Sequence, residues 1–137
     1  KELRFSDSAR EELQVLLSAL DDILDITLRS FQAADTQLAR QVEPLEETID
    51  QLIEEIRTRH TQRLQTGQCT IQLGFVLSDL LTNIERVSDH CSNIAVGVIQ
   101  EKDGGPGGHA YLQEVKAGGA FSEDLRRDQK KYHLPEA

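Results

Sequence analysis

The stretch Leu80-Leu-Thr-Asn-Ile-Glu85-Arg-Val-Ser-Asp89-His90-Cys-Ser-Asn93-Ile-Ala95 is the part of the chain that decides the fold. Apolar residues recur in and around it every three or four positions, as they do along one face of an α-helix. This face consists of Leu73, Leu77, Leu80, Ile84, Val87, Cys91, Ile94 and Val98. Glu85 and Asp89 are spaced i,i+4 and lie about 100–160° from the centre of that face, at the 100° per residue of an α-helix. Such an acidic row is either well solvated or holds cations.

The composition is that of one domain with a single core. The chain has 137 residues, of which 38% are hydrophobic and 28% charged, and this length suffices to bury one core. Aromatic residues make up only 4%, and Leu and Ile are frequent, which favours a helical core over a sheet. The net charge of -9 argues against a nucleic-acid surface, because phosphate binding needs a basic patch. An acidic excess fits cation binding, but most acidic domains are merely soluble.

Two further features of the composition concern the origin of the chain. Cys69 and Cys91 form no CxxC pattern, so a reducing compartment is the simpler interpretation. The sequence contains no Met, and we therefore expect either that residues were trimmed from it or that it is a piece of a longer protein. It also contains no run of 18 apolar residues of the kind that spans a membrane.

The apolar periodicity predicts three long helices. The first runs from about Asp7 to Ala33, and Ser8-Ala-Arg-Glu11 reads as a capping box near its start. Its apolar seam is Leu13, Leu17, Leu20, Leu24, Leu28 and Phe31. The second follows a cap at Asp35 and ends at Thr66-Gly67. Its seam is Leu38, Val42, Leu45, Ile49, Leu52 and Ile56.

Pro44 interrupts the second seam, and we expect a kink or a restart there because proline removes a helical amide. The third helix begins at Cys69-Thr70 and extends to about Gln100. Short connections between the helices force an antiparallel up-down-up arrangement. The sequence therefore predicts an all-α, antiparallel three-helix bundle.

The C-terminal part differs in composition. Asp103-Gly-Gly-Pro-Gly-Gly108 predicts a flexible connector. Two short helical segments follow, around His109 to Ala117 and Ser122 to Tyr132. We predict a bundle over residues 1–103, a connector over 104–108 and a C-terminal helical hairpin over 109–137.

Two acidic rows with the same spacing occur on neighbouring predicted helices. Glu46 and Asp50 repeat the pattern of Glu85 and Asp89, and in an antiparallel pair such rows can lie along one groove. Four carboxylates there would suit Mg, Mn, Fe or Zn through oxygen ligands. The alternative is a pair of solvated rows.

Two observations favour the solvated alternative. Arg57 and Arg86 are near enough to neutralise some of the charge. Asp21 and Asp25 have the same i,i+4 spacing, which shows how common the pattern is.

The remaining polar residues point to no catalytic motif. The sequence has no ferritin-like Glu-x-x-His, HExxH, GxSxG or P-loop. Cys91 lies on the apolar face, where a buried small hydrophobe is the more common case. The candidate histidines, each more often a surface or capping residue than a ligand, are His60, His90 and His109. Arg57, Arg59, His60 and Arg63 form a basic segment that we interpret as a solvated face with internal ion pairs.

Two segments resemble the PhoU domain family. Ile84-Glu-Arg-Val-Ser-Asp-His-Cys-Ser-Asn-Ile-Ala95 resembles its helix signature LERIGDHAxNIA, with Val-Ser for Ile-Gly and Cys for the usual Ala. Val42-Glu-Pro-Leu-Glu-Glu-Thr-Ile-Asp50-Gln-Leu is similar to the second helix of the family. A finer resemblance is to the C-terminal cytoplasmic PhoU domain of bacterial sodium/phosphate cotransporter-family proteins. It is carried by Gln68-Cys-Thr-Ile-Gln-Leu-Gly-Phe, the signature helix and the end piece from His109-Ala-Tyr-Leu to Tyr132-His-Leu-Pro.

The resemblance implies a regulatory rather than a catalytic domain. In this family the E(D)xxxD pairs bind multinuclear metal clusters, so Glu46, Asp50, Glu85 and Asp89 would be ligands for divalent or trivalent ions (Fe, Zn, Mn or Mg). The domain would lie on the cytoplasmic face of the plasma membrane and act on the transmembrane transporter part of its own parent chain. Free-standing PhoU proteins usually carry two such bundles, and this chain has one, so we expect a homodimer.

Two other functions remain open on the sequence alone. The chain would be a metal-free helical interaction or dimerisation module if the acidic rows are only solvated faces. A carboxylate-metal enzyme is the third alternative.

Overall fold

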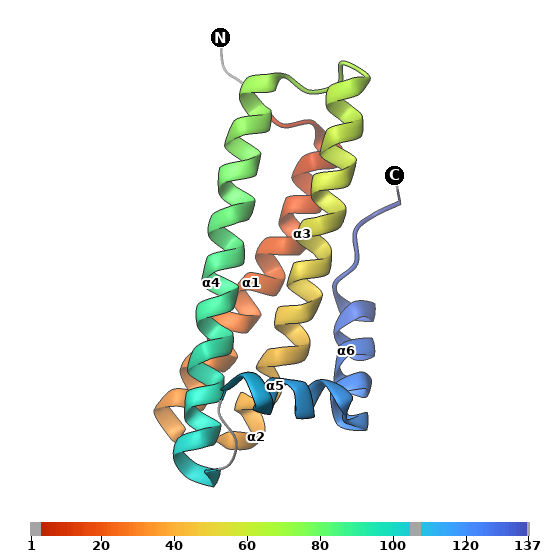
Figure 1. Cartoon of the computed structure of the whole chain (residues 1–137). Coiled ribbons are helices and arrows are strands. Elements are labelled where there is room, and N and C mark those ends of the chain that lie inside the picture. The colour runs from red at the N-terminus through yellow and green to blue at the C-terminus, as the bar shows by residue number, and fades with distance from the viewer. Residues whose placement is uncertain (1–3, 105–107, 137) are drawn as a thin grey trace.

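The computed structural model describes residues 4–104 and 108–136, and these residues form helices and connecting loops without strands. The helices are α1 (Asp7–Ala33), α2 (Thr36–Ala39), α3 (Val42–Gln65), α4 (Ile71–Asp103), α5 (Gly108–Ala117) and α6 (Gly119–Lys131). Three long helices lie side by side, with α1 and α4 running in one direction and α3 in the other (Figure 1). This confirms the predicted all-α, antiparallel three-helix bundle.

Short polar side chains define where the helices begin. Asp35 Oδ1 accepts from the Leu38 amide at 3.1 Å, and Thr70 Oγ1 accepts from the Leu73 amide at 3.2 Å, so both act as N-caps. The cap of α1 is Ser6, whose Oγ accepts from the Ala9 amide at 3.2 Å. The predicted capping box at Ser8 is wrong, because the helix has already begun at Asp7 and Ser8 lies in its first turn.

The predicted break at Pro44 takes the form of a restart. The short α2 ends at Ala39, and α3 begins at Val42. Pro44 therefore lies in the first turn of α3, where the missing N–H has no helical partner to lose. At the other end, α3 ends before Gly67, which has φ +76°, a conformation that glycine adopts without strain.

The faces that α3 and α4 bury in the core are largely the predicted ones. The face that α1 buries differs from the predicted one. The residues that α1 buries are Ala9, Glu12, Leu13, Leu16, Ala19, Ile23, Thr27 and Ser30. Most of the predicted α1 seam is exposed, namely Leu17 (45%), Leu24 (37%), Leu28 (58%) and Phe31 (65%). Small residues such as Ala19 and Ser30, both 0% exposed, allow close packing of α1, and the larger leucines are left beside the core. On α4, Ile94 is exposed although it belongs to the predicted apolar face.

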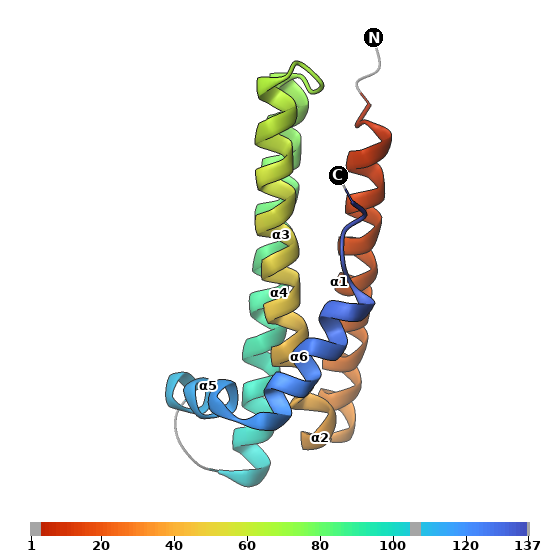
Figure 2. The same cartoon turned by 90° about the vertical axis from the view of Figure 1, so that its right-hand side faces the viewer.

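The C-terminal helices pack on the bundle. Figure 2 shows α6 lying along α3, with the end of the chain running upward beside α1. Tyr132 and Leu134 are buried in the same core as the long helices. The second C-terminal helix begins at Gly119, three residues before the predicted Ser122. Of the predicted connector, residues 105–107 lie outside the described part of the chain.

None of the helices in the described ranges has the length and apolar character needed to cross a lipid bilayer.

Candidate metal centre

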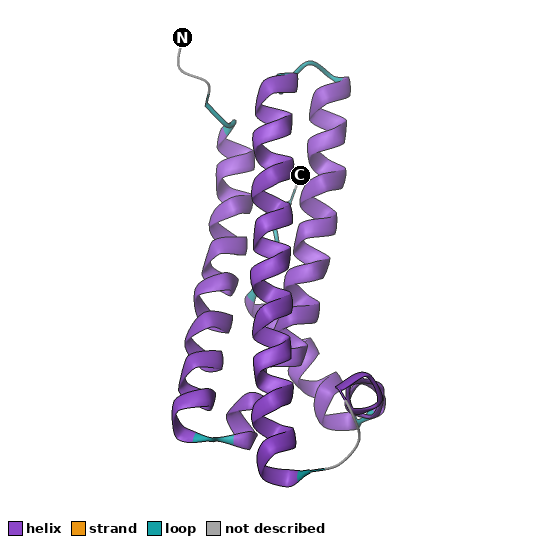
Figure 3. Ribbon diagram, turned by 60° about the vertical axis from the view of Figure 1, so that its left-hand side comes forward, coloured by secondary structure: helices purple, strands orange, loops and turns teal. Residues whose placement is uncertain are grey.

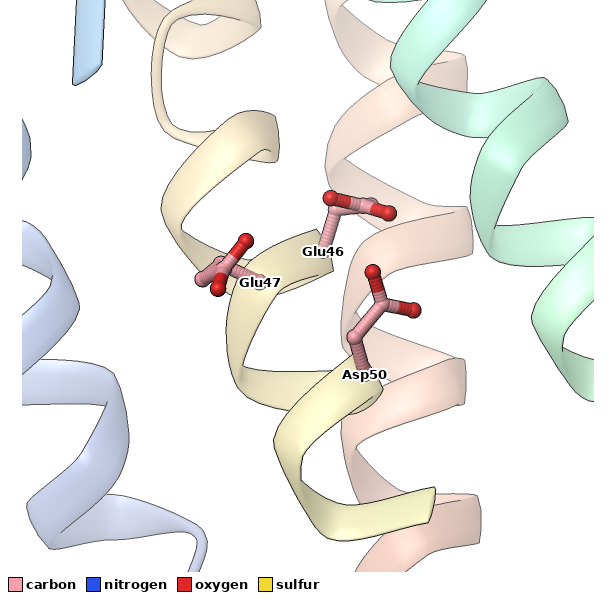
Figure 4. Close-up of side chains that lie close together, drawn as sticks. All are labelled: Glu46, Glu47 and Asp50. Carbon is pink, nitrogen blue, oxygen red and sulfur yellow. The ribbon is translucent and has the colours of Figure 1, made fainter. Parts of the chain in front are cut away.

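The most unusual group of side chains is a carboxylate cluster on the first turns of α3. Glu46 and Asp50 project one turn apart from the same side of the helix, with Glu47 beside them (Figure 4). One carboxylate oxygen from each of the three lies within 4.8 Å of those of the other two. Glu46 is only 6% exposed, and Asp50 is half-buried. The cluster therefore concentrates negative charge where water solvates it poorly.

Burial changes the protonation of this pair. The pKa of Glu46 is raised far above its ordinary value, first by burial and then by the hydrogen bond and charge of Asp50 and the charges of Glu43 and Asp89. Burial also raises the pKa of Asp50, while its hydrogen bond with Glu46 acts in the opposite direction. Without a metal ion, burial and the neighbouring acids favour the protonated form of Glu46. Buried carboxyl groups keep a proton in this way when no cation compensates them.

The second predicted row lies on α4, near enough for its charges to act on the cluster. Glu85 and Asp89 are exposed on α4. The charge of Asp89 raises the pKa of both Glu46 and Asp50, and the charge of Glu85 raises that of Asp50. Of the four sequence-predicted ligands, the structure places Glu46 and Asp50 in one cluster with Glu47, and neither Glu85 nor Asp89 belongs to that cluster. The two rows differ in burial, which their identical spacing does not reveal.

Residues that sequence reasoning missed complete the surroundings of the cluster. Glu43 is buried, and Ser92 of α4 donates a hydrogen bond to its Oε2 at 2.6 Å. Lys116 Nζ of α5 lies 3.6 Å from Glu43 Oε1 and 3.8 Å from Glu47 Oε2. The sequence signal that could have pointed to Glu43 and Glu47 is the high density of acidic residues in Val42-Glu-Pro-Leu-Glu-Glu-Thr-Ile-Asp50. Nothing in the sequence placed Lys116 beside it.

The buried acids of the bundle differ in how they are compensated. Glu12 is 2% exposed, and it accepts from Arg59 at 2.9 Å and from Arg63 at 2.5 Å. Glu43 accepts a hydrogen bond from Ser92 and forms an ion pair with Lys116. The nearest acidic neighbours of Glu46 are Asp50 and Glu47. Asp50 Oδ1 is buried without a hydrogen-bond partner among the described residues. An unsatisfied buried acceptor next to three further carboxylates fits an oxygen-ligated cation.

Comparison with known proteins identifies the family of the helical bundle. The family model described as "PhoU domain" matches residues 13–98. The chain belongs to the PhoU domain family. This is a regulatory family of phosphate transport, and the matched segment contains all four predicted ligands.

One curated relative of this PhoU domain comes from Thermotoga maritima. It is called "Phosphate-specific transport system accessory protein PhoU homolog 1", and it is 24% identical over 94 residues. The alignment covers 69% of this chain and 40% of the relative, so the PhoU domain described here corresponds to less than half of that protein. No solved structure matches the chain significantly.

The other candidate residues of the PhoU domain lie away from the carboxylate cluster or are already partnered. Asp25 forms an exposed ion pair with Arg29 at 3.2 Å, so the row that begins at Asp21 is solvated. Cys91 is buried, and burial raises the pKa of its thiol, which keeps the sulfur neutral. His90 is exposed on α4, and the side chain of His109 lies outside the described residues.

The basic segment of α3 is used internally. Arg59 and Arg63 pair with Glu12 of α1, as the interpretation of internal ion pairs predicted. Arg57 contacts Thr82 Oγ1 of α4 at 3.4 Å. His60 is 9% exposed, and its pKa is lowered by burial and by the charge of Arg63. His60 is ten residues beyond Asp50, about 15 Å along the helix at 1.5 Å per residue, too far to join the carboxylate cluster.

Proposed function

We propose that this chain is the metal-binding regulatory domain of a sodium-dependent phosphate cotransporter. Membership of the PhoU family supports a role in phosphate transport. The cotransporter assignment rests on the resemblance of the segments from Gln68 to Phe75 and from His109 onward to the cytoplasmic domains of that group. The metal-binding part is supported by one observation above all: a buried Glu46 and a half-buried Asp50 lie side by side on α3, and the charge of Asp89 on α4 acts on both.

The ligand set defines the kind of ion. Glu46, Asp50, Glu85 and Asp89 offer only carboxylate oxygens, which suit Fe, Mn, Mg or Zn. Glu47 lies close enough to add a further oxygen. A bound ion would replace the proton that Glu46 holds, so binding releases a proton and strengthens as the pH rises.

The proposed site would also have a means of regulation. Two of the ligands belong to α3 and two to α4, so an ion bound by both rows would join the two helices. Lys116 at the edge of the cluster links the same region to α5. Metal occupancy would therefore change how firmly the C-terminal helices and the bundle are held together, which is a signal that a transporter can receive.

The proposed setting is the cytoplasmic face of the plasma membrane. The partner would be the transmembrane transporter part of the parent chain. Nucleic acid is not a proposed partner, because the net charge is -9 and phosphate backbones repel such a surface. The proposed role is regulatory and not enzymatic.

Sodium-driven phosphate uptake by the full-length parent protein tests this function. Cells that express the parent are compared with cells that express Glu46→Gln/Asp50→Asn and, as a matched control, Asp21→Asn/Asp25→Asn. We expect sodium-dependent uptake in all three, with its response to external phosphate altered only in the first variant. Uptake that does not depend on sodium, or an equal response in both variants, would contradict the proposal.

A metal-free interaction module is the second candidate, because α1 presents an exposed apolar face. The two candidate functions predict different amounts of metal bound to the purified chain. In an interaction module, Glu46→Gln/Asp50→Asn would change neither bound metal nor partner binding.

A further inference from the structure

The turn between α3 and α4 forms one end of the bundle. Figure 3 shows this turn at the end opposite α5, and Figure 2 shows that it stands further out than the beginning of α1. We call residues 56–78, which comprise the end of α3, the turn and the beginning of α4, the α3–α4 tip. The sequence between Glu55 and Asp79 contains no acidic residue, and this is the longest such interval in a chain with 24 acidic residues. The α3–α4 tip is therefore the part of this acidic chain that an anionic surface repels least.

The α3–α4 tip exposes large apolar side chains. Ile71 and Phe75 are each 71% exposed, and Val76 is 53% exposed. Ile71 and Phe75 are four positions apart, so they lie one above the other on the same side of α4. Among the described residues, no other large apolar side chain is as exposed as these two. Adjacent apolar side chains that remain in water mark a contact surface.

A hollow of about 400 Å³ lies between the two helices of the α3–α4 tip. Its walls are mostly apolar and include Leu64, Ile71 and Phe75. His60 also lines the hollow, and burial lowers the pKa of His60, so this part of the wall is uncharged at neutral pH. Arg57 is the one residue of the described lining that carries a charge. The hollow is therefore suited to an apolar group that lies beside an anion.

Arg57 is the arginine of the α3–α4 tip that forms no ion pair with a described carboxylate. Arg59 and Arg63 form ion pairs with the buried Glu12 of α1. Arg57 instead donates to the hydroxyl of Thr82 at 3.4 Å, and it lines the hollow. Guanidinium groups bind phosphate oxygens through two parallel hydrogen bonds. An apolar hollow with one such group beside it matches a phospholipid, in which a phosphate adjoins the acyl chains.

The orientation of the domain favours a bilayer as the occupant, and this step rests on the proposed function. In a parent chain whose transporter part precedes this domain, the connection enters the bundle through residues 4–6, at the same end as the α3–α4 tip (Figure 1). That end would face the bilayer. The beginning of α1, which carries Asp7 and Glu11 in its first turns, lies further from it (Figure 2). Charges more than about 10 Å from a membrane surface are largely screened.

We propose that the α3–α4 tip binds the surface of the bilayer, with Ile71 and Phe75 at the boundary between headgroups and acyl chains and Arg57 on a lipid phosphate. Aromatic side chains favour this boundary, and apolar residues beside cationic ones are typical of surfaces that lie on a membrane. The affinity of the separate domain is low, because few side chains enter the lipid. Linkage to the transporter part raises the effective concentration of the tip at the membrane, so a weak contact is sufficient in the parent protein.

A tryptophan at the α3–α4 tip tests this contact. The chain contains no Trp, so Phe75→Trp supplies a single indole. The variant is made in a Cys69→Ser background, in which the remaining Cys91 is 3% exposed. A cysteine added before the first residue is coupled to a maleimide lipid in vesicles of phosphatidylcholine and phosphatidylglycerol, which imitates the link to the transporter part. We expect the emission of Phe75→Trp to shift to shorter wavelength on the vesicles, relative to the same protein in buffer.

Phe31→Trp, coupled in the same way, is the matched control. Phe31 is 65% exposed, but it lies at the other end of the bundle, near the end of α1. Its emission should not shift on the vesicles. Equal shifts in the two proteins would overturn the proposal, because contact would then not be specific to the tip. The absence of a shift in Phe75→Trp would also overturn it and would assign the exposed apolar side chains to a protein partner.

Sedimentation with the same vesicles, without the tether and at high lipid concentration, measures what the side chains contribute. Ile71→Glu/Phe75→Glu should lower the bound fraction about tenfold, with its helical circular dichroism intact. Leu28→Glu/Phe31→Glu introduces the same charge at exposed positions of α1 and should leave the bound fraction unchanged. Equal losses in the two variants would reflect net charge alone and would refute the contact.

Arg57→Gln should lower the bound fraction about fivefold. The control is Arg86→Gln, because Arg86 is exposed on α4 outside the α3–α4 tip, and this variant should bind as the unmodified chain does. The same loss in both would remove Arg57 from the proposed contact.

Metal content separates this proposal from the proposed function. None of these variants alters Glu46 or Asp50, so elemental analysis should find the same metal in each as in the unmodified chain. A chain that binds metal but not vesicles would overturn the bilayer contact and leave the proposed metal site standing. A chain that binds vesicles but no metal would support the bilayer contact and contradict the metal site alone.

Discussion

Glu46 and Asp50 are one turn apart on α3 and hold carboxylate oxygens within 4.8 Å of each other. The two groups are spaced as an exposed acidic row would be, yet one is buried and the other half-buried. Burial raises the pKa of both groups, so a proton kept on Glu46 spares the metal-free bundle an uncompensated charge. The same arrangement becomes a pair of adjacent ligands once a cation displaces the proton.

Removing the charge of Glu46 should stabilise the metal-free domain. Glu46→Gln keeps a hydrogen-bond donor toward Asp50 but no longer has to take up a proton on folding. We expect the free energy of unfolding at pH 8, in the presence of a chelator, to rise by about 1 kcal/mol, as typically follows when a functional site is relieved of strain. Glu54→Gln is the control, because Glu54 is exposed on the same helix and should change stability by less than about 0.5 kcal/mol. A destabilised Glu46→Gln protein would contradict the raised pKa of Glu46.

The stability of the metal-free domain should depend on pH in a defined direction. The pKa of Glu46 is raised on folding from its ordinary value of 4.5, so the folded state binds the proton more tightly than the unfolded chain. This contribution to stability is complete below pH 4.5 and is lost as the pH rises toward the folded pKa. Urea unfolding in chelator should therefore show a steeper loss of stability between pH 6 and pH 8 for the unmodified chain than for Glu46→Gln. Parallel pH profiles would argue against the raised pKa.

Lys116 should weaken metal binding. Its ammonium group is 3.6 Å from Glu43 and 3.8 Å from Glu47, so it reduces the negative potential that attracts a cation. Its side chain is 45% exposed, and exposed ion pairs contribute about 0.2–1 kcal/mol. Lys116→Gln should accordingly raise the affinity for Mn, measured by calorimetry, by about two- to five-fold. Lys130→Gln, at an exposed lysine of α6, should leave it unchanged, and an equal effect of both variants would indicate only a change in net charge.

Ser92 should matter for stability but not for metal content. Its hydroxyl donates to Glu43 Oε2 at 2.6 Å, and both residues are buried. Ser92→Ala leaves that carboxylate oxygen without its donor, which should cost about 1–3 kcal/mol. The exposed Ser78 of the same helix provides the control variant Ser78→Ala. Loss of bound metal in Ser92→Ala at unchanged stability would show that Glu43 belongs to the ligand set.

The sequence predicted the helices well because their signals are local. The cap at Asp35, the start of the third helix at Cys69-Thr70 and the effect of Pro44 depend on a few neighbouring residues, and the structure confirms each of them. The core face of α1 was not predictable in the same way. Two periodic stripes overlap on that helix, and the choice between them depends on the small residues that pack against α3 and α4.

The candidate site shows the same limit. Spacing alone placed Glu46 and Asp50 on one side of a helix, and helix order placed Glu85 and Asp89 on its neighbour. Burial of Glu46 depends on what covers α3, which spacing does not specify. Lys116 approaches from a segment about 70 positions further along the chain, so no local pattern could connect it with the cluster.

Metal content is the measurement that tests the account most directly. The chain is purified without chelator, exposed to Mn, Fe or Zn, desalted and examined by elemental analysis. It is compared with Glu46→Ala/Asp50→Ala/Glu85→Ala/Asp89→Ala and with the control Asp21→Asn/Asp25→Asn. We predict stoichiometric metal in the unmodified chain and the control, and none in the fourfold variant with its helical spectrum intact. Equal and near-zero metal in all three proteins would contradict the proposed metal site and would leave the family assignment standing.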